Sequence, residues 1–220
     1  MSKKSFFVIY INDNDLKTII DSIRVVADPQ QKSSSHVTVK GPYKTNQVKR
    51  LQEESKAIEG KYFPVFGVGT FFHLNQNTVF WRCSNENILH DIWKTKSKKT
   101  YDDYHPHITI YDGTDRNYAQ KLFKIINFFD IHFSFKINKL EIYSSNPLFN
   151  LKTFADYEFI TREVGYDINK NNIDNLTPKQ RLYIVSKLCK KLQLILKEKN
   201  PHNLKSLYKR HKEELLSHNI

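Results

Sequence analysis

The feature that most constrains the fold of this chain is an internal repeat. When the sequence is shifted by 71 residues and laid on itself, His36-Val-Thr-Val falls on His107-Ile-Thr-Ile without a gap. At the same shift, Val8-Ile-Tyr falls on Val79-Phe-Trp. A fixed period of this kind is typical of a duplicated supersecondary unit. We therefore expect two copies of one unit, related by a pseudo-two-fold axis.

Each copy is predicted to run β-α-β-α-β. Runs of β-branched and aromatic residues predict strands, and apolar residues three or four places apart predict helices. In the first half these patterns predict strands at 5–11, 35–40 and 62–73 and helices at 13–26 and 45–58. In the second half they predict strands at 78–83, 107–111 and 131–144 and helices at 86–94 and 115–129, with 154–161 as an additional strand candidate. Gly41-Pro42 is expected to end the second strand.

The predicted fold class is α+β, with two related sheets side by side and a groove on the axis between them. Residues 1–160 form the expected bilobal domain, with lobes at roughly 5–75 and 76–160. The two His-x-Thr strands would be symmetry mates in this arrangement. Two histidines that are distant in sequence could therefore meet in the groove.

Residues 161–220 fall outside the repeat and form a basic helical extension. They hold 13 Lys/Arg and 6 Asp/Glu, a net +7 of the chain's +12. After a polar linker, Thr177-Pro178 predicts a capped helix start, and Pro201 is expected to open a second helix. The favoured interpretation is a helical hairpin that packs on the lobes with its charged face in water. The alternative is an appendage that binds nucleic acid or a partner protein.

The composition limits the functional classes. A net charge of +12 and a pI near 9.5 favour polyanionic partners such as nucleic acid, nucleotides or anionic membrane, although a solvated basic surface gives the same balance. Cys83 and Cys189 have no CxxC partner, which argues against a zinc site or disulfide scaffold and fits the cytoplasm. The apolar run at 6–11 is too short for a secretory signal, and no run has membrane-spanning length.

The repeated strands carry the candidate chemistry. Residues two apart on a strand share a face, so His36 lies beside Thr38 and His107 beside Thr109, while the intervening apolar residues enter the core. Two imidazoles can act as a general acid and base near neutral pH, and threonine hydroxyls can donate to phosphate oxygens without any metal or cofactor. The alternative is a pair of ordinary strand histidines. His132-Phe-Ser134 has the same spacing but falls on Lys61 in the repeat, so we interpret it as unrelated.

Several residues near the motifs are candidates for binding the substrate. Tyr10 and Trp81 occupy equivalent repeat positions, and aromatic rings near a phosphate site can stack on bases, although core packing explains such rings equally well. Arg82 is given less weight because it follows Trp81 and should point to the opposite face. The basic segment 94–106 is either a lid over an anionic ligand or an exposed loop. The remaining candidates beside the motifs are Lys40, Tyr43 and Tyr111.

The two motifs resemble those of the 2H phosphoesterase superfamily, also called the LigT-like or 2′-5′ RNA ligase-like family. "HVTVKGPY" at 36–43 is similar to the family's first motif, and "HPHITIYDG" at 105–113 is similar to the second. The resemblance covers roughly residues 5–160 and leaves 161–220 outside the pattern. It implies a bilobal fold with mainly antiparallel sheets around a central groove. The implied catalytic residues are His36, Thr38, His107 and Thr109.

The resemblance also implies an activity. Members are metal-independent phosphodiesterases, hydrolases that act on 2′,3′-cyclic phosphates, RNA ends, 2′-5′ oligoadenylates or cyclic oligonucleotides. Some degrade nucleotide messengers of antiviral immunity, and that role is an expectation here beside RNA processing. One alternative is a binding module that sequesters RNA or a nucleotide without cleaving it, and another is a ligase that reverses the hydrolysis. Two intact motifs favour an enzyme, because binding alone does not need two imidazoles.

Overall fold

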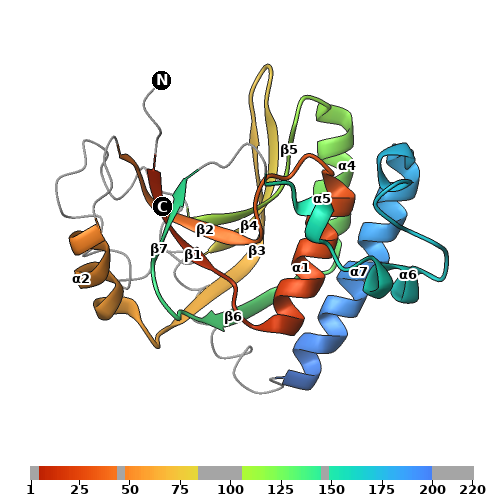
Figure 1. Ribbon diagram of the computed structural model, residues 1–220. Coiled ribbons are helices and arrows are strands. Elements are labelled where there is room, and N and C mark those ends of the chain that lie inside the picture. Colours follow the sequence, from red (N-terminus) through yellow and green to blue (C-terminus); the bar gives the residue numbers. More distant parts are fainter. Residues whose placement is uncertain (1–4, 44–47, 84–105, 145–148, 200–220) are drawn as a thin grey trace, which may run out of the picture.

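The computed structural model describes residues 5–43, 48–83, 106–144 and 149–199 (Figure 1). The described part is an α+β fold with two antiparallel sheets and a long C-terminal helix. The first sheet has the order β2-β1-β7 and the second has the order β5-β4-β3-β6. The strands of the first sheet are β1 (Ser5–Tyr10), β2 (His36–Tyr43) and β7 (Glu141–Ser144). Those of the second are β3 (Tyr62–Phe72), β4 (Asn77–Cys83), β5 (His107–Gly113) and β6 (His132–Lys136).

The two His-x-Thr strands are β2 and β5, and each is an edge strand of its sheet. These two edges lie next to each other, so residues about 70 positions apart in the chain become neighbours. The strands that carry the two motifs therefore lie close to each other, as expected.

Each sheet takes strands from both halves of the chain, contrary to the expected lobes at 5–75 and 76–160. β3 belongs to the first half but pairs with β4 along most of its length, in a hairpin closed by a 2.8 Å hydrogen bond from the His73 amide to the Gln76 carbonyl. β7 belongs to the second half but pairs with β1. The predicted lobe boundary therefore falls inside a hairpin, where backbone hydrogen bonds join the two sides.

Helices α1 and α4 lie against the sheets and are started by side-chain caps. The Asp13 carboxylate accepts from the Leu16 amide at the start of α1 (Asn14–Ala27), and Asp115 does the same at α4 (Arg116–Phe128). α4 packs on β3, β4 and β5, and α1 contacts β5. α2 (Val48–Ile58) lies at the opposite end of the molecule (Figure 1).

Two local predictions were wrong. The strand candidate at 154–161 is instead occupied by α5 (Leu151–Phe154) and α6 (Tyr157–Val164). Asp156 caps the N-terminus of α6 and Gly165 ends it at a φ of +83°, and these signals outweigh the aromatic content of the segment. β2 continues through Gly41-Pro42 to Tyr43, because proline is tolerated on an edge strand. The predicted helix at 86–94 lies outside the described residues.

The C-terminal extension is part of the same core. After η2 (Ile173–Asn175), α7 (Pro178–Lys199) packs on α1 and α4 from the side away from the sheets (Figure 1). Its start is the predicted capping box, in which the Thr177 amide donates to Gln180 Oε1 (2.8 Å) and the Gln180 amide to Thr177 Oγ1 (3.3 Å). The inward side chains of α7 are fully buried: Ile184, Val185, Leu188 and Leu192. The helix predicted after Pro201 lies outside the described residues.

No helix in the described ranges is both long enough and apolar enough to cross a membrane.

Candidate active site

His36 lies at the start of the edge strand β2, between aromatic rings from the adjacent strand β1 and from β7, the strand beyond it. It pairs across the sheet with Tyr10, whose ring centroid is 5.7 Å away. Tyr143 of β7 stacks on the imidazole at 5.4 Å with an interplanar angle of 22°. The sequence analysis predicted Tyr10 here but missed Tyr143, because only the pairing of β7 with β1 brings it close.

The tautomer of His36 follows from its hydrogen bonds. Its Nδ1 lies 2.9 Å from the Ser34 carbonyl oxygen and 3.3 Å from Ser33 Oγ. A carbonyl can only accept, so Nδ1 carries the hydrogen and Nε2 has the free lone pair. Within the described residues, Nε2 makes no hydrogen bond. It is therefore available to accept a proton.

The surroundings of His36 keep it neutral. Burial and, next, the positive charge of Arg24 lower the pKa of His36 to about 4, with a smaller lowering from His107, while the Ser34 carbonyl opposes them. The influence of His107 also places the two imidazoles within electrostatic range of each other. At neutral pH, His36 is thus an uncharged imidazole.

His107 lies at the start of β5 in a different setting. Phe80 and Phe71 lie against its ring, with centroids 4.8 and 5.6 Å away, and the two phenylalanines stack on each other at 4.4 Å. The residue opposite His107 on β4 is Arg82. Because paired residues share a face, Arg82 and Phe80 accompany His107, and Trp81 does not.

Trp81 was predicted as a substrate contact, and the structure places it in the core instead. It is 0% exposed, pairs with Ile108 and lies edge-on to Phe133 at 6.4 Å. The repeat aligns Trp81 with Tyr10, but Tyr10 pairs with His36, whereas Trp81 pairs with the residue after His107. This offset of one residue reverses the face on which the aromatic ring lies.

Tyr111 was also predicted on the His107 face and is likewise buried in the core. Phe80 pairs with Thr109 but Val79 pairs with Tyr111, so Ile110 is an extra residue in β5, a β-bulge. The bulge breaks the two-residue alternation and turns Tyr111 towards Tyr118, whose ring centroid is 5.1 Å away. Tyr111 is only 8% exposed, and burial raises the pKa of its hydroxyl.

Arg82 is the cation that the sequence analysis underestimated. It is exposed, and within the described part of the chain it has no acidic partner. Gly69 of β3 leaves the room for it, since a Cβ atom there would lie 2.8 Å from Arg82 Nε and 2.5 Å from the Phe80 ring. The sequence shows that Arg82 and Phe80 are two positions apart and so share one face of a strand. Only the structure supplies the register that places this face beside His107.

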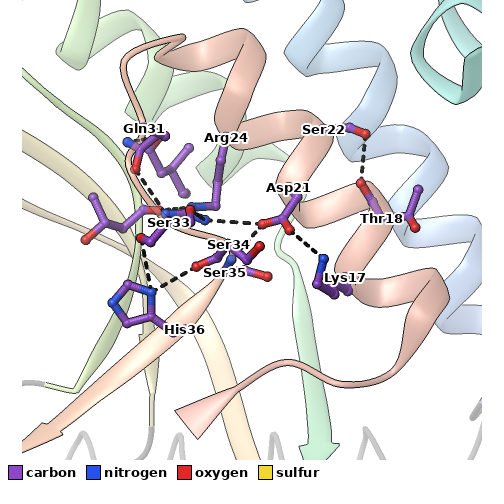
Figure 2. Close-up of polar contacts among 12 residues, drawn as sticks. Lys17, Thr18, Asp21, Ser22, Arg24, Gln31, Ser33, Ser34, Ser35 and His36 are labelled. Carbon is purple, nitrogen blue, oxygen red and sulfur yellow. Dashed lines mark hydrogen bonds and ion pairs between the residues drawn. The ribbon is translucent and has the colours of Figure 1, made fainter. Parts of the chain in front are cut away.

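Arg24 of α1 forms hydrogen bonds to the backbone of β5 and to the segment just before β2 (Figure 2). It is 1% exposed and donates through Nε to the Thr109 carbonyl of β5 at 2.7 Å. It also donates to the Ser33 carbonyl at 2.8 Å, just before β2. The sequence analysis did not identify Arg24, because a lone arginine among the apolar positions of a helix is not by itself a signal of function.

The remaining predicted site residues are placed only in part. Thr38 and Thr109 are partly exposed, and by register Thr109 shares the face of Phe80. The side chains of Lys40 and Tyr43 lie outside the described residues, as do residues 94–105 of the candidate lid at 94–106. The alternation that placed Lys40 beside His36 is interrupted, since Val8 pairs with Thr38 but Phe7 pairs with Lys40.

His132 differs from the two motif histidines in position and partner. It lies on β6, at the edge of the second sheet opposite β5, and its Nε2 is 2.8 Å from Asp130 Oδ1. Among the described residues there is no group of three or more His, Cys, Asp or Glu side chains arranged to hold a metal ion.

Comparison with models of known protein families finds no match to this chain, and a search of curated proteins likewise finds no relative.

Proposed function

We propose that this protein is a metal-independent phosphodiesterase that acts on RNA ends, 2′-5′ oligoadenylates or cyclic oligonucleotides. The observation that carries the proposal is the approach of His36 and His107 on the adjacent edge strands of two sheets, within electrostatic range of each other. Two imidazoles on rigid strands can provide general acid and general base in one phosphoryl transfer.

The different surroundings of the histidines suggest their roles. His36 has an unprotonated Nε2 and a lowered pKa, so we assign it as the general base, which takes the proton of the attacking ribose hydroxyl or water. His107 in its imidazolium form would then donate a proton to the leaving oxygen. One P–O bond forms and one breaks, with a proton gained at His36 and one lost at His107. Thr38 and Thr109 can donate to the non-bridging oxygens.

Arg82 supplies a positive charge beside the proposed acid. A phosphodiester carries one negative charge, and a guanidinium matches two of its oxygens. Arg82 lies on the His107 face without an acidic partner among the described residues. We propose that it binds the scissile phosphate or the next one along the chain. The net charge of +12 favours the approach of such a polyanion.

A cleavage screen in the presence of EDTA tests the proposal. The panel holds 2′,3′-cyclic nucleotides, 2′-5′ oligoadenylate, short RNAs with defined ends, and cyclic di- and trinucleotides. We expect the wild type to cleave one class and the His36→Ala/His107→Ala variant to cleave none. Loss of cleavage with EDTA would overturn the metal-free mechanism. Binding without cleavage by both proteins would identify a sequestering module instead.

A substrate class found in this screen also defines the biological setting. Cleavage of cyclic oligonucleotides or 2′-5′ oligoadenylate would support a role against nucleotide-signalled antiviral immunity. Cleavage of RNA ends or 2′,3′-cyclic phosphates would support RNA processing. Incubating the products with the enzyme at high concentration tests for the reverse, ligating reaction.

A further inference from the structure

We propose that Arg24 is a positioning residue that holds the two histidine strands in a fixed relation to each other. The assignment to catalysis rests on the proposed function, whereas the structural link between Arg24 and the strands can be tested without any activity.

Arg24 contacts two parts of the chain outside α1, residues 31–33 (Figure 2) and Thr109. Nε donates to the Thr109 carbonyl at 2.7 Å, one Nη donates to the Ser33 carbonyl at 2.8 Å, and the other Nη donates to Gln31 Oε1 at 3.0 Å. Thr109 belongs to the second motif, and Ser33 lies three residues before His36. A planar guanidinium with fixed donor directions therefore sets the distance between the two motifs.

A second residue of α1, Asp21, also bonds the segment just before β2. Asp21 Oδ1 accepts from the Ser35 amide at 2.6 Å and from the Arg24 guanidinium at 3.2 Å. Between these two anchors lies Ser34, whose carbonyl accepts the Nδ1 hydrogen of His36. The contacts thus form a continuous path from α1 through residues 33–35 to the tautomer of His36.

Burying Arg24 costs free energy, so packing alone does not explain its position. Placing an arginine at 1% exposure removes its hydration, and pairing only partly offsets this cost. Apart from Asp21 and Ser22, the other buried positions of α1 are filled by apolar residues. An apolar side chain would satisfy the core here, but it could not bond the Thr109 and Ser33 carbonyls together.

The charge of Arg24 also acts on His36 directly. After burial, it is the largest cause of the lowered His36 pKa. The other charged or titratable groups around this imidazole are Asp21 on α1, His107 on β5, and Tyr10 and Tyr143 on β1 and β7, with Glu141 close to Tyr10. Removing the Arg24 charge should therefore raise the pKa of His36.

Arg181 of α7 offers a matched control. It is partly buried, less so than Arg24, and likewise bonds backbone carbonyls, at 2.8 Å to Val26, 2.7 Å to Ile173 and 3.1 Å to Leu176. These carbonyls belong to α1, η2 and the start of α7, and none lies on β2 or β5. Arg181 therefore shares the structural role of Arg24 without the link to the histidines.

The test compares Arg24→Lys with Arg181→Lys. Both variants keep the charge and lose the fork of donors, and both should melt at lower temperature than the wild type. We expect kcat to fall about tenfold or more in Arg24→Lys and to stay within about twofold in Arg181→Lys. Equal kcat losses in the two variants would overturn the proposal, since they would reflect stability alone.

An NMR titration provides the readout that needs no substrate. Arg24→Gln combined with Asp21→Asn removes both buried charges together, so that neither is left unpaired, and serves if Arg24→Lys does not fold. We expect the pKa of His36 to rise in this double variant and to stay unchanged in Arg181→Gln. An unchanged His36 pKa would overturn the link. Failure of the wild type to cleave any substrate would instead overturn the proposed function.

Discussion

The strands β2 and β5 carry the same His-x-Thr pattern in different surroundings. The imidazole of His36 is fixed by the Ser34 carbonyl and stacked by Tyr143, and its pKa is lowered to about 4. The imidazole of His107 lies against Phe71 and Phe80 and faces Arg82 across the sheet. Two motifs of the same pattern can thus favour opposite proton transfers, one accepting and one donating, because the protonation of each histidine depends on neighbours outside the motif.

The two strands nevertheless share a backbone irregularity. β5 has an extra residue at Ile110, and β2 has one at Val39, which is the same position in the repeat. A β-bulge re-aims the residues that follow it, so each strand presents its His and Thr together and then changes face. The difference between the two sites therefore comes from neighbouring elements rather than from the strands themselves.

The largest expected effect separates the two histidines by pH. His36→Ala and His107→Ala should each lower kcat by about 10²- to 10⁴-fold while leaving the far-UV spectrum unchanged. The residual activity of His36→Ala should lose the acidic limb of the pH profile, and that of His107→Ala the basic limb. The pH dependence of kcat in both variants is the measurement. The opposite assignment of limbs would exchange the proposed acid and base.

A smaller effect concerns stability against pH. The folded-state pKa of His36, about 4, lies below its ordinary value of 6.5, so the unfolded chain binds more protons between these pH values. The contribution is complete above about pH 6.5 and is lost as the pH falls towards 4. We expect the free energy of unfolding to fall by roughly 2 kcal/mol more in the wild type than in His36→Gln. Urea titrations at pH 7 and 4.5 test this, and equal losses would contradict it.

Gly69→Ala tests the packing on the His107 side alone. The added Cβ would lie 2.5 Å from the Phe80 ring, which must then move against His107. We expect a loss of about 1–3 kcal/mol in stability together with a lower kcat. Gly113→Ala is the control, since its Cβ would meet Tyr111 in the same sheet, away from His107. If both variants lost kcat to the same extent at equal stability, the packing of Phe80 on His107 would have no specific effect on catalysis.

The smallest effect tests Arg82. Arg82→Gln should raise KM about tenfold, leave kcat nearly unchanged and lower the slope of log KM against log salt by about 1. Lys136→Gln is the matched control, because Lys136 is an exposed cation on β6, at the edge of the sheet opposite β5. An equal effect of both substitutions would show that Arg82 contributes only through the net positive charge of the protein.

The sequence predicted most elements because their signals are local. Alternating residues around His36 and His107 gave the strands and the buried faces at Val37 and Ile108, and Asp13 and Asp115 marked helix starts within one residue. The segment at 154–161 failed because its caps were overlooked beside its aromatic residues. At the site, the positions of His36 and Tyr10 were predicted, whereas those of Trp81 and Tyr111 were wrong.

The local residue pattern was enough to predict two similar strands, each with a histidine and a threonine above an apolar face. Tertiary contacts set the rest: these strands lie at adjacent sheet edges, Trp81 and Tyr111 enter the core, and Arg24 bonds the Thr109 carbonyl of one motif and the Ser33 carbonyl just before the other. The physical reason is the range of the interactions. Periodicity and capping act over a few residues, whereas strand pairing, bulges and buried hydrogen bonds depend on distant partners, 85 positions away for Arg24 and Thr109 and 155 for Arg181 and Val26.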